Sequence, residues 1–365
     1  MTALLIQTLL AVGVLFAVVN FAALHTWIER KQSALMQDRI GANRASIFGV
    51  RALGLFHPLA DAIKMFMKED YIPPKGDKLL HTLAPFLSLT FSLVAFAAIP
   101  FGDILRLGGL EIPLQVAPIN VGLVYILAMM SMGVYGVILA GFSSNNNYAF
   151  LGGMRASSQM LAYEITLGAT ILGIVMIYGS LDLQEISRRQ GGLLFGWLPM
   201  WGFLVQPAGL FLFMAAGIAE TKRIPYDIPE GESEIIGYFT EYSGMKFGMF
   251  YFTDFIETIL IASLTTTLFF GGWQVPYLYR GGFYLPWVDG GNTLAWALPH
   301  LAVVPLQVGA FVSKVVFFCW LFMTIRWTLP RFRYDQLMNL GWKIIFPISL
   351  LNLIVTAAVL LIVGR

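Results

Sequence analysis

The hydrophobic residues of this chain gather in long runs separated by shorter polar segments. About eight of these runs are long enough, as helices, to cross the ~30 Å hydrocarbon core of a bilayer. The runs cover residues 3–25, 82–101, 119–141, 158–179, 198–220, 247–271, 301–325 and 342–363. The pattern predicts an all-α, polytopic membrane protein that forms a single integral membrane domain over residues 1–365. The first run follows Met1 without a basic leader or a cleavage site, so we expect it to be retained.

The first polar segment, residues 29–80, contains a different periodic pattern. From Pro58, a residue that suits the first turn of a helix, apolar side chains recur with the spacing of one helix face. They are Leu59, Ala62, Ile63, Phe66 and Met67, while Asp61, Lys64 and Lys68 share the other face. This amphipathic helix could lie in the membrane interface or line a cavity that is reached from the lipid. The pattern leaves both roles open.

The overall composition fits a membrane protein and narrows its partners. The chain is 58% hydrophobic and 12% charged, whereas about a quarter of the residues in soluble domains are charged. Its formal net charge is +2 and it has no basic stripe, so we expect the lipid bilayer and no nucleic acid as partners.

The positive charges are divided unequally between the two sides of the predicted bundle. Of the 23 Lys and Arg residues, 17 lie in the segments that follow the first, third, fifth and seventh runs. Under the positive-inside rule these segments face the cytoplasm and both termini face outward. The expected cytoplasmic loops cover about residues 29–80, 142–157, 221–246 and 326–341.

Metal and nucleotide chemistry have little support in the sequence. Cys319 is the only cysteine, which excludes a disulfide within the chain and a cluster that needs about four cysteine ligands. The four histidines lack metal-ligand spacing, and no GxGxxG or phosphate-binding loop is present. We therefore expect no catalytic residue, metal, flavin or iron–sulfur cluster on this chain alone.

The most acidic part of the chain is "IPYDIPEGESEIIGYFTEYSG", residues 224–244. Its carboxylates belong to Asp227, Glu230, Glu232, Glu234 and Glu241. Composition alone is typical of a solvated loop. Two features favour burial instead: Pro225 and Pro229 exclude a regular helix around Asp227, and acidic residues continue into the flanking apolar runs.

Charges inside the apolar runs favour a functional role, because each costs about 2.5–3.5 kcal/mol at the centre of a membrane helix. Glu164 in "LAYEITLG" is the clearest case, and a structural hydrogen bond within the bundle is its alternative role. Asp254 and Glu257 are three residues apart and hence on one helix face. Lys314 is a candidate partner for them, or a residue that extends toward the membrane surface.

Six segments taken together resemble one family. They are "ERKQSALMQDRIGANR", "PLADAIKMFMKED", "AYEI", "IPYDIPEGESE", "EYSGMKF" and "LPRFRYDQLMNLGWK". The chain resembles the H subunit of proton-pumping NADH:quinone oxidoreductase (respiratory complex I), equivalent to the first mitochondrially encoded subunit. The alternative is the homologous membrane subunit of an F420-dependent dehydrogenase or a membrane-bound hydrogenase. A free-standing transporter would more often show inverted repeats, and none is detectable.

The resemblance implies a role at the junction of the two arms of the complex. Such a subunit docks the peripheral arm, forms most of the quinone tunnel, and starts a chain of buried carboxylates that couples quinone reduction to proton translocation. Quinone, such as ubiquinone, is then the substrate, and the redox cofactors lie on partner subunits of the peripheral and membrane arms. The expected location is the bacterial inner (plasma) membrane.

The resemblance also assigns residues. The positions that match the quinone tunnel are Glu29, Arg30, Arg39, Ala60, Asp61, Lys64, Arg331 and Arg333, with Glu29 and Arg30 as an acid–base pair. The positions that match the proton path are Glu164, Glu220, Asp227, Glu230, Glu232, Glu234, Glu241 and Asp254.

Four departures from the family pattern bear on these assignments. Ala42 stands in "GANR" where proline is usual, and Asp254 stands where glutamate is expected. His57 replaces glutamine near the expected tunnel mouth, as a titrating group or as a helix cap. The stretch from Glu234 to Glu241 is one residue shorter than usual. The long outer segment 272–300 suggests no chemistry.

Overall fold

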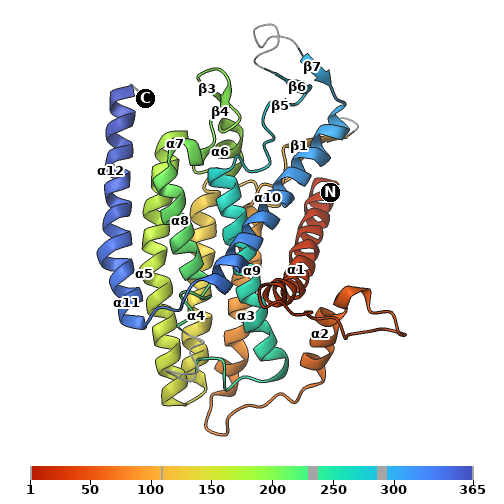
Figure 1. The fold of residues 1–365 in the computed structure, drawn as a ribbon, viewed down its shortest axis with the longest axis vertical. Coiled ribbons are helices and arrows are strands. Elements are labelled where there is room, and N and C mark those ends of the chain that lie inside the picture. The colour runs from red at the N-terminus through yellow and green to blue at the C-terminus, as the bar shows by residue number, and fades with distance from the viewer. Residues whose placement is uncertain (1, 108–109, 229–236, 286–293, 364–365) are drawn as a thin grey trace.

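The computed structural model describes residues 2–107, 110–228, 237–285 and 294–363, and long helices dominate it (Figure 1). Within those ranges, seven helical segments are long and apolar enough to cross a membrane. They are α1 (Thr2–Met36), α3 (Lys78–Val94, continued by the 3-10 turn η2, Ala95–Ala98), α4 (Gly122–Ser143), α5 (Asn147–Tyr178), α9 (Gly244–Phe269), α10 (His300–Thr328) and the continuous α11 (Tyr334–Asn339), η4 (Leu340–Ile345) and α12 (Phe346–Val363). The predicted all-α polytopic class is confirmed.

The apolar run at 198–220 does not form one long helix. It folds into α7 (Gly202–Val205) and α8 (Pro207–Glu220), and the backbone of Gln206 between them has φ −139° and ψ 66°. Residues before proline avoid the helical conformation, which accounts for a break at Gln206. Helix α8 has 14 residues and is therefore about 21 Å long, shorter than the hydrocarbon core.

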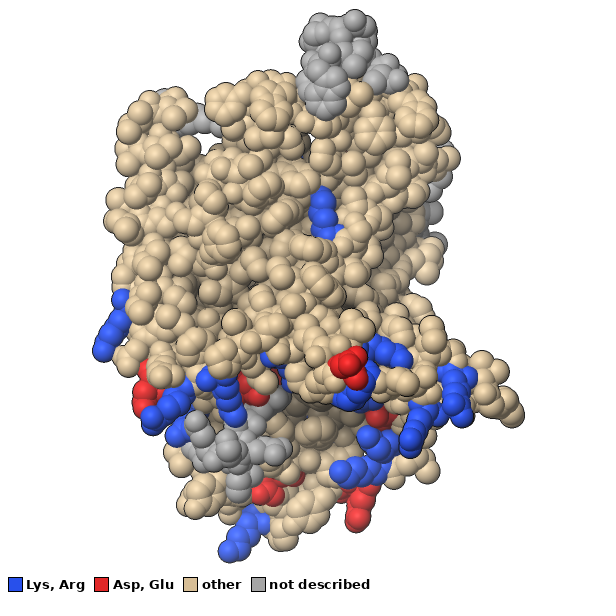
Figure 2. Space-filling view, viewed as in Figure 1, with Lys and Arg blue, Asp and Glu red and all other residues tan. Residues whose placement is uncertain are grey.

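The two ends of the bundle differ in structure and in charge. The small sheets lie at one end, which we call the hairpin end: β1 (Ile104–Leu107) pairs antiparallel with β2 (Leu110–Pro113), β3 (Leu193–Leu194) with β4 (Leu198–Pro199), and β6 (Gly282–Tyr284) lies between β5 (Leu278–Tyr279) and β7 (Leu294–Ala297). The short helix α6 (Leu183–Arg189) is also there. At the opposite, charged end, α1 ends and α9 begins. Figure 2 shows that the Lys, Arg, Asp and Glu side chains gather mostly toward this end.

Helix α9 lies at the centre of the bundle. Every residue from Thr253 to Phe269 is buried, and the helix packs against α1, α3, α8 and α10. Its serine and threonine hydroxyls in this stretch donate to backbone carbonyls four residues earlier, as Thr258 does to Asp254 (2.7 Å). The helix can therefore carry polar residues in an apolar core, because their hydrogen bonds are made internally.

Small residues bring α3, α4 and α5 close together. A Cβ atom on Gly136 of α4 would lie 2.9 Å from the Ala84 carbonyl oxygen of α3. A Cβ on Gly141 would lie 2.9 Å from the Ala149 carbonyl oxygen of α5. Close approach of this kind is how membrane helices associate when lipid removes the hydrophobic driving force.

Helix α2 (His57–Met67) confirms the predicted amphipathic helix and packs against α1 and α9. Its apolar residues Leu59, Ile63 and Met67 point outward, since they are 49%, 55% and 82% exposed. Asp61 faces inward and its side chain is only 23% exposed. The two roles left open by the sequence are thus compatible: one face is available to lipid while the other contributes to the inside of the protein.

Several helices extend beyond the apolar runs that predicted them. Helix α1 continues through Glu29 to Met36, and α5 begins at Asn147, within the segment expected as the loop 142–157. The Asn146 side chain accepts a hydrogen bond from the Tyr148 backbone N–H (3.0 Å) and caps α5. Hydropathy marks the part of a helix that contacts lipid, whereas capping decides where the helix starts.

Candidate functional site

An apolar cavity of about 300 Å³ lies between α1, α2, α3 and α9 near the charged end. Most of its wall is aliphatic, aromatic or methionine, including Met65 and Phe66 of α2 and Phe252 of α9. Thr26, Asp61 and Tyr251 are the polar side chains among its lining residues. An apolar pocket with few polar groups suits a ligand with a hydrophobic body and a polar head.

Asp61 holds α1 and α2 together at this cavity. The Arg30 guanidinium of α1 donates to Asp61 Oδ2 (2.5 Å), and Lys64 Nζ lies 3.3 Å from Asp61 Oδ1. Asp61 is therefore the charged group in the cavity wall, and Arg30 and Lys64 contact it from outside the lining residues. A carboxylate held in this way can exchange hydrogen bonds with a polar head group.

Glu29 belongs to a second charged cluster, deeper in the protein. It is 5% exposed and accepts hydrogen bonds from Arg223 (3.2 Å) and from Arg326. The Arg223 guanidinium carbon also lies 3.9 Å from the centre of the Phe255 ring of α9. Glu29 and Arg30 therefore do not form the expected pair with each other, because adjacent side chains on a helix point about 100° apart.

Lys222 lies at the centre of a third cluster, formed with two carboxylates of α9. Its ammonium nitrogen is 3.1 Å from Asp254 Oδ1 and 3.4 Å from Glu257 Oε2. The Ser92 hydroxyl of α3 donates to the other oxygen of Glu257 (3.2 Å). Since burial penalises a lone charge more than a paired one, each of these groups depends on the others.

Lys314 is not the partner of Asp254 and Glu257, so that hypothesis was wrong. Its ammonium group donates to the carbonyl oxygens of Phe270, Gly272 and Gln274, at 2.8, 3.0 and 2.7 Å. It therefore caps the carbonyl end of α9, where the helix dipole favours a cation.

Glu220 and Glu164 extend the acidic residues between α8, α9 and α5. Glu220, the last residue of α8, is 1% exposed and has no hydrogen-bond partner for either carboxyl oxygen within the described part of the chain. Glu164 of α5 accepts a hydrogen bond from Ser131 of α4. Glu257 and Glu164 are both within electrostatic range of Glu220. Of the predicted acidic positions, Glu220 and Asp254 are thus buried and Glu164 is half-buried in this part of the bundle.

The other assigned residues are more scattered. Arg331 donates to the backbone carbonyl of Asp227, which is buried, and Glu241 accepts from Asn146 Nδ2 (2.7 Å). Arg39, Ala60 and Arg333 are exposed and do not line the cavity. Glu230, Glu232 and Glu234 lie outside the described residues.

His57 anchors the start of α2. Its Nδ1 donates to the Gly54 carbonyl oxygen (2.8 Å), across the turn η1 (Ala52–Gly54). This contact ties the first turn of α2 to the preceding turn, but it is not a helix cap, because the N-cap residue is Phe56 and no side chain of the described residues caps this helix. A titrating role for His57 stays a prediction.

Four residues that complete the two inner clusters were missed: Lys222, Arg223, Arg326 and Ser92. A signal was available for the first two, because "ETKRIPYD" places two cations directly beside Glu220 at the end of an apolar run. Ser92 and Arg326 gave no comparable signal, since only helix packing brings them to the carboxylates.

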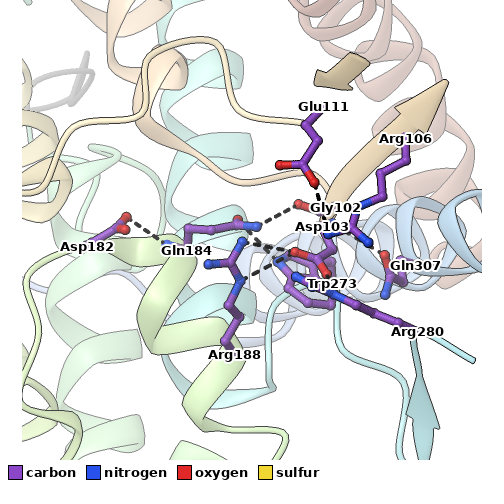
Figure 3. A network of polar contacts seen from close by, with 10 residues as sticks. All are labelled: Gly102, Asp103, Arg106, Glu111, Asp182, Gln184, Arg188, Trp273, Arg280 and Gln307. Carbon is purple, nitrogen blue, oxygen red and sulfur yellow. Dashed lines mark hydrogen bonds and ion pairs between the residues drawn. The ribbon is translucent and has the colours of Figure 1, made fainter. Parts of the chain in front are cut away.

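A further charged cluster lies at the hairpin end (Figure 3). Asp103 accepts hydrogen bonds from Arg188 of α6 (3.0 Å) and from Arg280 before β6 (2.8 Å), and its backbone N–H donates to Gln307 of α10 (3.3 Å). Burial alone would raise the pKa of the Asp103 carboxyl, but the hydrogen bonds from Arg280 and Arg188 hold that pKa below its usual value. This cluster gives segment 272–300 a structural role in tying the hairpin end together.

These features define the class as a polytopic α-helical membrane protein with an apolar cavity beside buried charge clusters. The chain matches the family model described as NADH dehydrogenase over residues 9–357. It is 43% identical over 360 residues to an NADH-quinone oxidoreductase H subunit of Cytophaga hutchinsonii, covering 98% of each chain. It is 41% identical over 360 residues to the H subunit of the same enzyme from Thermomicrobium roseum, covering 98% of this chain and 96% of that relative.

The chain belongs to the family of NADH-quinone oxidoreductase H subunits. It is therefore a membrane component of a multisubunit enzyme, respiratory complex I, and the predicted family is confirmed. The names of these relatives favour this family over the F420-dependent dehydrogenase and hydrogenase alternatives.

Proposed function

We propose that the cavity between α1, α2, α3 and α9 is part of a tunnel that admits quinone from the bilayer. The observation that carries this proposal is the inward placement of Asp61 on the wall of an apolar cavity, paired with Arg30. The quinone tail would lie along the methionine and aromatic wall, and its head would reach the Arg30–Asp61 pair. A quinone is the substrate expected from the family resemblance.

The two-sided character of α2 supports entry from the lipid. Leu59, Ile63 and Met67 face outward, and Asp61 faces the cavity. A helix of this kind lies at the membrane surface with its apolar side in the acyl region. A hydrophobic ligand can then move from the bilayer past α2 without crossing bulk water.

The inner clusters supply a route for coupling to proton movement. Reduction of quinone to quinol consumes protons as well as electrons, and the electrons come from partner subunits of the peripheral arm. Lys222 and Arg223 are consecutive, so the cluster at Glu29 is joined to the cluster at Asp254 and Glu257 by a single peptide bond. A change in charge at Glu29 would move both cations and alter the field at Glu220 and Glu164.

The orientation of the bundle in the membrane follows from the distribution of Lys and Arg residues and from the proposed role in quinone reduction. The charged end would face the bacterial cytoplasm, where the peripheral arm docks, and both termini would lie outside. Arg331 and Arg333 follow α10 in the sequence. The membrane would be the bacterial inner (plasma) membrane.

An Asp61→Asn variant tests the tunnel role, because asparagine keeps the shape of aspartate and removes its charge. Quinone-linked NADH oxidation in assembled complex should fall by about tenfold or more, which corresponds to about 1.4 kcal/mol of lost transition-state stabilisation. Electron transfer to an artificial acceptor on the peripheral arm should stay unchanged. Glu111→Gln removes an exposed carboxylate at the hairpin end and serves as the matched control. Equal loss of both activities in the Asp61 variant would refute the assignment.

A further inference from the structure

A second hollow lies beside the cavity, between α2, α3 and the first turn of α9. Its volume is about 1020 Å³, and we call it the lysine groove. Leu79, Leu83 and Phe86 of α3 form part of its wall together with Met245 of α9. These side chains are 38–72% exposed. Because α3 is a membrane-spanning helix, an exposed apolar wall on it faces acyl chains.

The rim of the groove is cationic. Lys68, Lys78 and Lys246 line it, together with a single carboxylate, that of Asp70. Lys246 offsets that carboxylate through an ion pair of 3.0 Å. Within the described residues, Lys68 and Lys78 form no ion pair, and both are exposed.

The nearby acid Asp77 does not neutralise these lysines. Its Oδ1 accepts hydrogen bonds from the backbone N–H groups of Leu79 and Leu80, at 2.9 and 3.2 Å, and caps the start of α3. The rim therefore presents two ammonium groups that form no ion pair within the described residues, and these favour a bound anion.

We propose that the lysine groove binds an anionic phospholipid. An apolar wall below a cationic rim matches acyl chains below a phosphate-bearing head group, and basic pockets between membrane helices bind such lipids. A neutral quinone carries no negative charge that could pair with the lysines, so we treat the groove as a site separate from the cavity. A negatively charged phosphatidylglycerol-type head would place its phosphate between Lys68 and Lys78.

The groove and the cavity share a wall. Met65 and Phe66 of α2, and Met245 and Met249 of α9, line both hollows. A bound lipid would therefore pack against the same side chains that face the cavity and would hold α2 against α9. The binding itself does not depend on what the cavity admits.

The test uses photoactivatable phosphatidylglycerol in nanodiscs that contain the assembled complex, followed by mass spectrometry of the labelled peptides. Wild-type protein should be labelled on the peptides of α2 and α3 that form the groove. Each lysine near an anionic surface contributes roughly fivefold to binding, so Lys68→Gln/Lys78→Gln should lower the labelling by about 25-fold. Lys68→Arg/Lys78→Arg should keep it. Lys75→Gln is the matched control, because Lys75 is exposed in the same segment but does not line the groove.

Two further measurements keep the proposal falsifiable if the double variant fails to assemble. In wild-type complex, phosphatidylglycerol labelling should fall as salt is added, and labelling by photoactivatable phosphatidylcholine should be weak and independent of salt. Equal labelling by the two lipids would overturn the proposal. So would unchanged labelling in the double glutamine variant, or cross-links from a partner subunit to the groove peptides in place of lipid.

Discussion

The ammonium nitrogen of Lys222 lies 3.1 Å from Asp254 Oδ1, and both side chains are almost fully buried. This ion pair joins the segment after α8 to the central helix α9. It also fixes Arg223, the next residue, beside Glu29 and Phe255. Each of these charges would be costly to bury alone. The pairs Lys222–Asp254 and Arg223–Glu29 lower that cost, because each charge lies beside one of opposite sign.

Replacing Lys222 by glutamine should leave Asp254 and Glu257 buried without a cation. Loss of one partner from a buried ion pair costs about 3–5 kcal/mol, so less complex should assemble and the melting temperature of purified complex should fall. Lys222→Gln combined with Asp254→Asn should recover part of the loss, because fewer unpaired charges remain. Normal assembly and melting in the single variant would show that water or a partner subunit already neutralises the carboxylates.

Glu29→Gln should weaken the contact between α1 and the ends of α8 and α10. The amide keeps one acceptor for Arg223 or Arg326 but removes the charge that holds both guanidinium groups. We expect a destabilisation of about 3 kcal/mol or more, measured by thermal unfolding of the complex. Glu111→Gln, which breaks an exposed pair with Arg106, should change stability by less than about 1 kcal/mol.

Asp103 should make the hairpin end sensitive to acid. Its folded-state pKa is lowered, so its contribution to stability is present above the unfolded value of about 3.9. That contribution is lost as the pH falls through the folded-state pKa. Asp103→Asn should therefore lower the melting temperature by a constant amount between about pH 5 and 8, with a difference that narrows as the pH falls below about 4. A difference that grows in acid would contradict the ion pairs with Arg188 and Arg280.

The sequence predicted the features that depend on the bilayer, and it predicted less about features that depend on packing. The membrane-spanning helices follow from the length of the apolar runs, and the amphipathic helix α2 follows from the spacing of its apolar residues. The break at Gln206 could also have been predicted, because Pro207 follows it. The pairing of Lys222 with Asp254 could not, since it depends on how α8 is placed against α9. The same holds for the separation of Glu29 from Arg30.

The roles assigned to Asp227, Glu241, Arg331 and the other acidic-path residues stay predictions. Resemblance supplied the candidates, and the structure gives partners for part of the set, such as Asn146 for Glu241. A contact identifies what a side chain can exchange hydrogen bonds with.

Glu164 lies on a membrane-spanning helix and accepts a hydrogen bond from Ser131. Glutamine keeps the size of the side chain and an oxygen that can accept from Ser131, but it cannot bind and release a proton. Glu164→Gln should therefore assemble normally and yet lose most quinone-linked turnover and proton pumping. Both are measured as NADH oxidation and acidification of sealed vesicles, normalised to assembled complex. Ser131→Ala is the matched control, because it removes the hydrogen bond and keeps the carboxyl group, so it should retain most of the pumping. If Glu164→Gln pumps at the wild-type rate, the contact with Ser131 is only a structural hydrogen bond between α4 and α5.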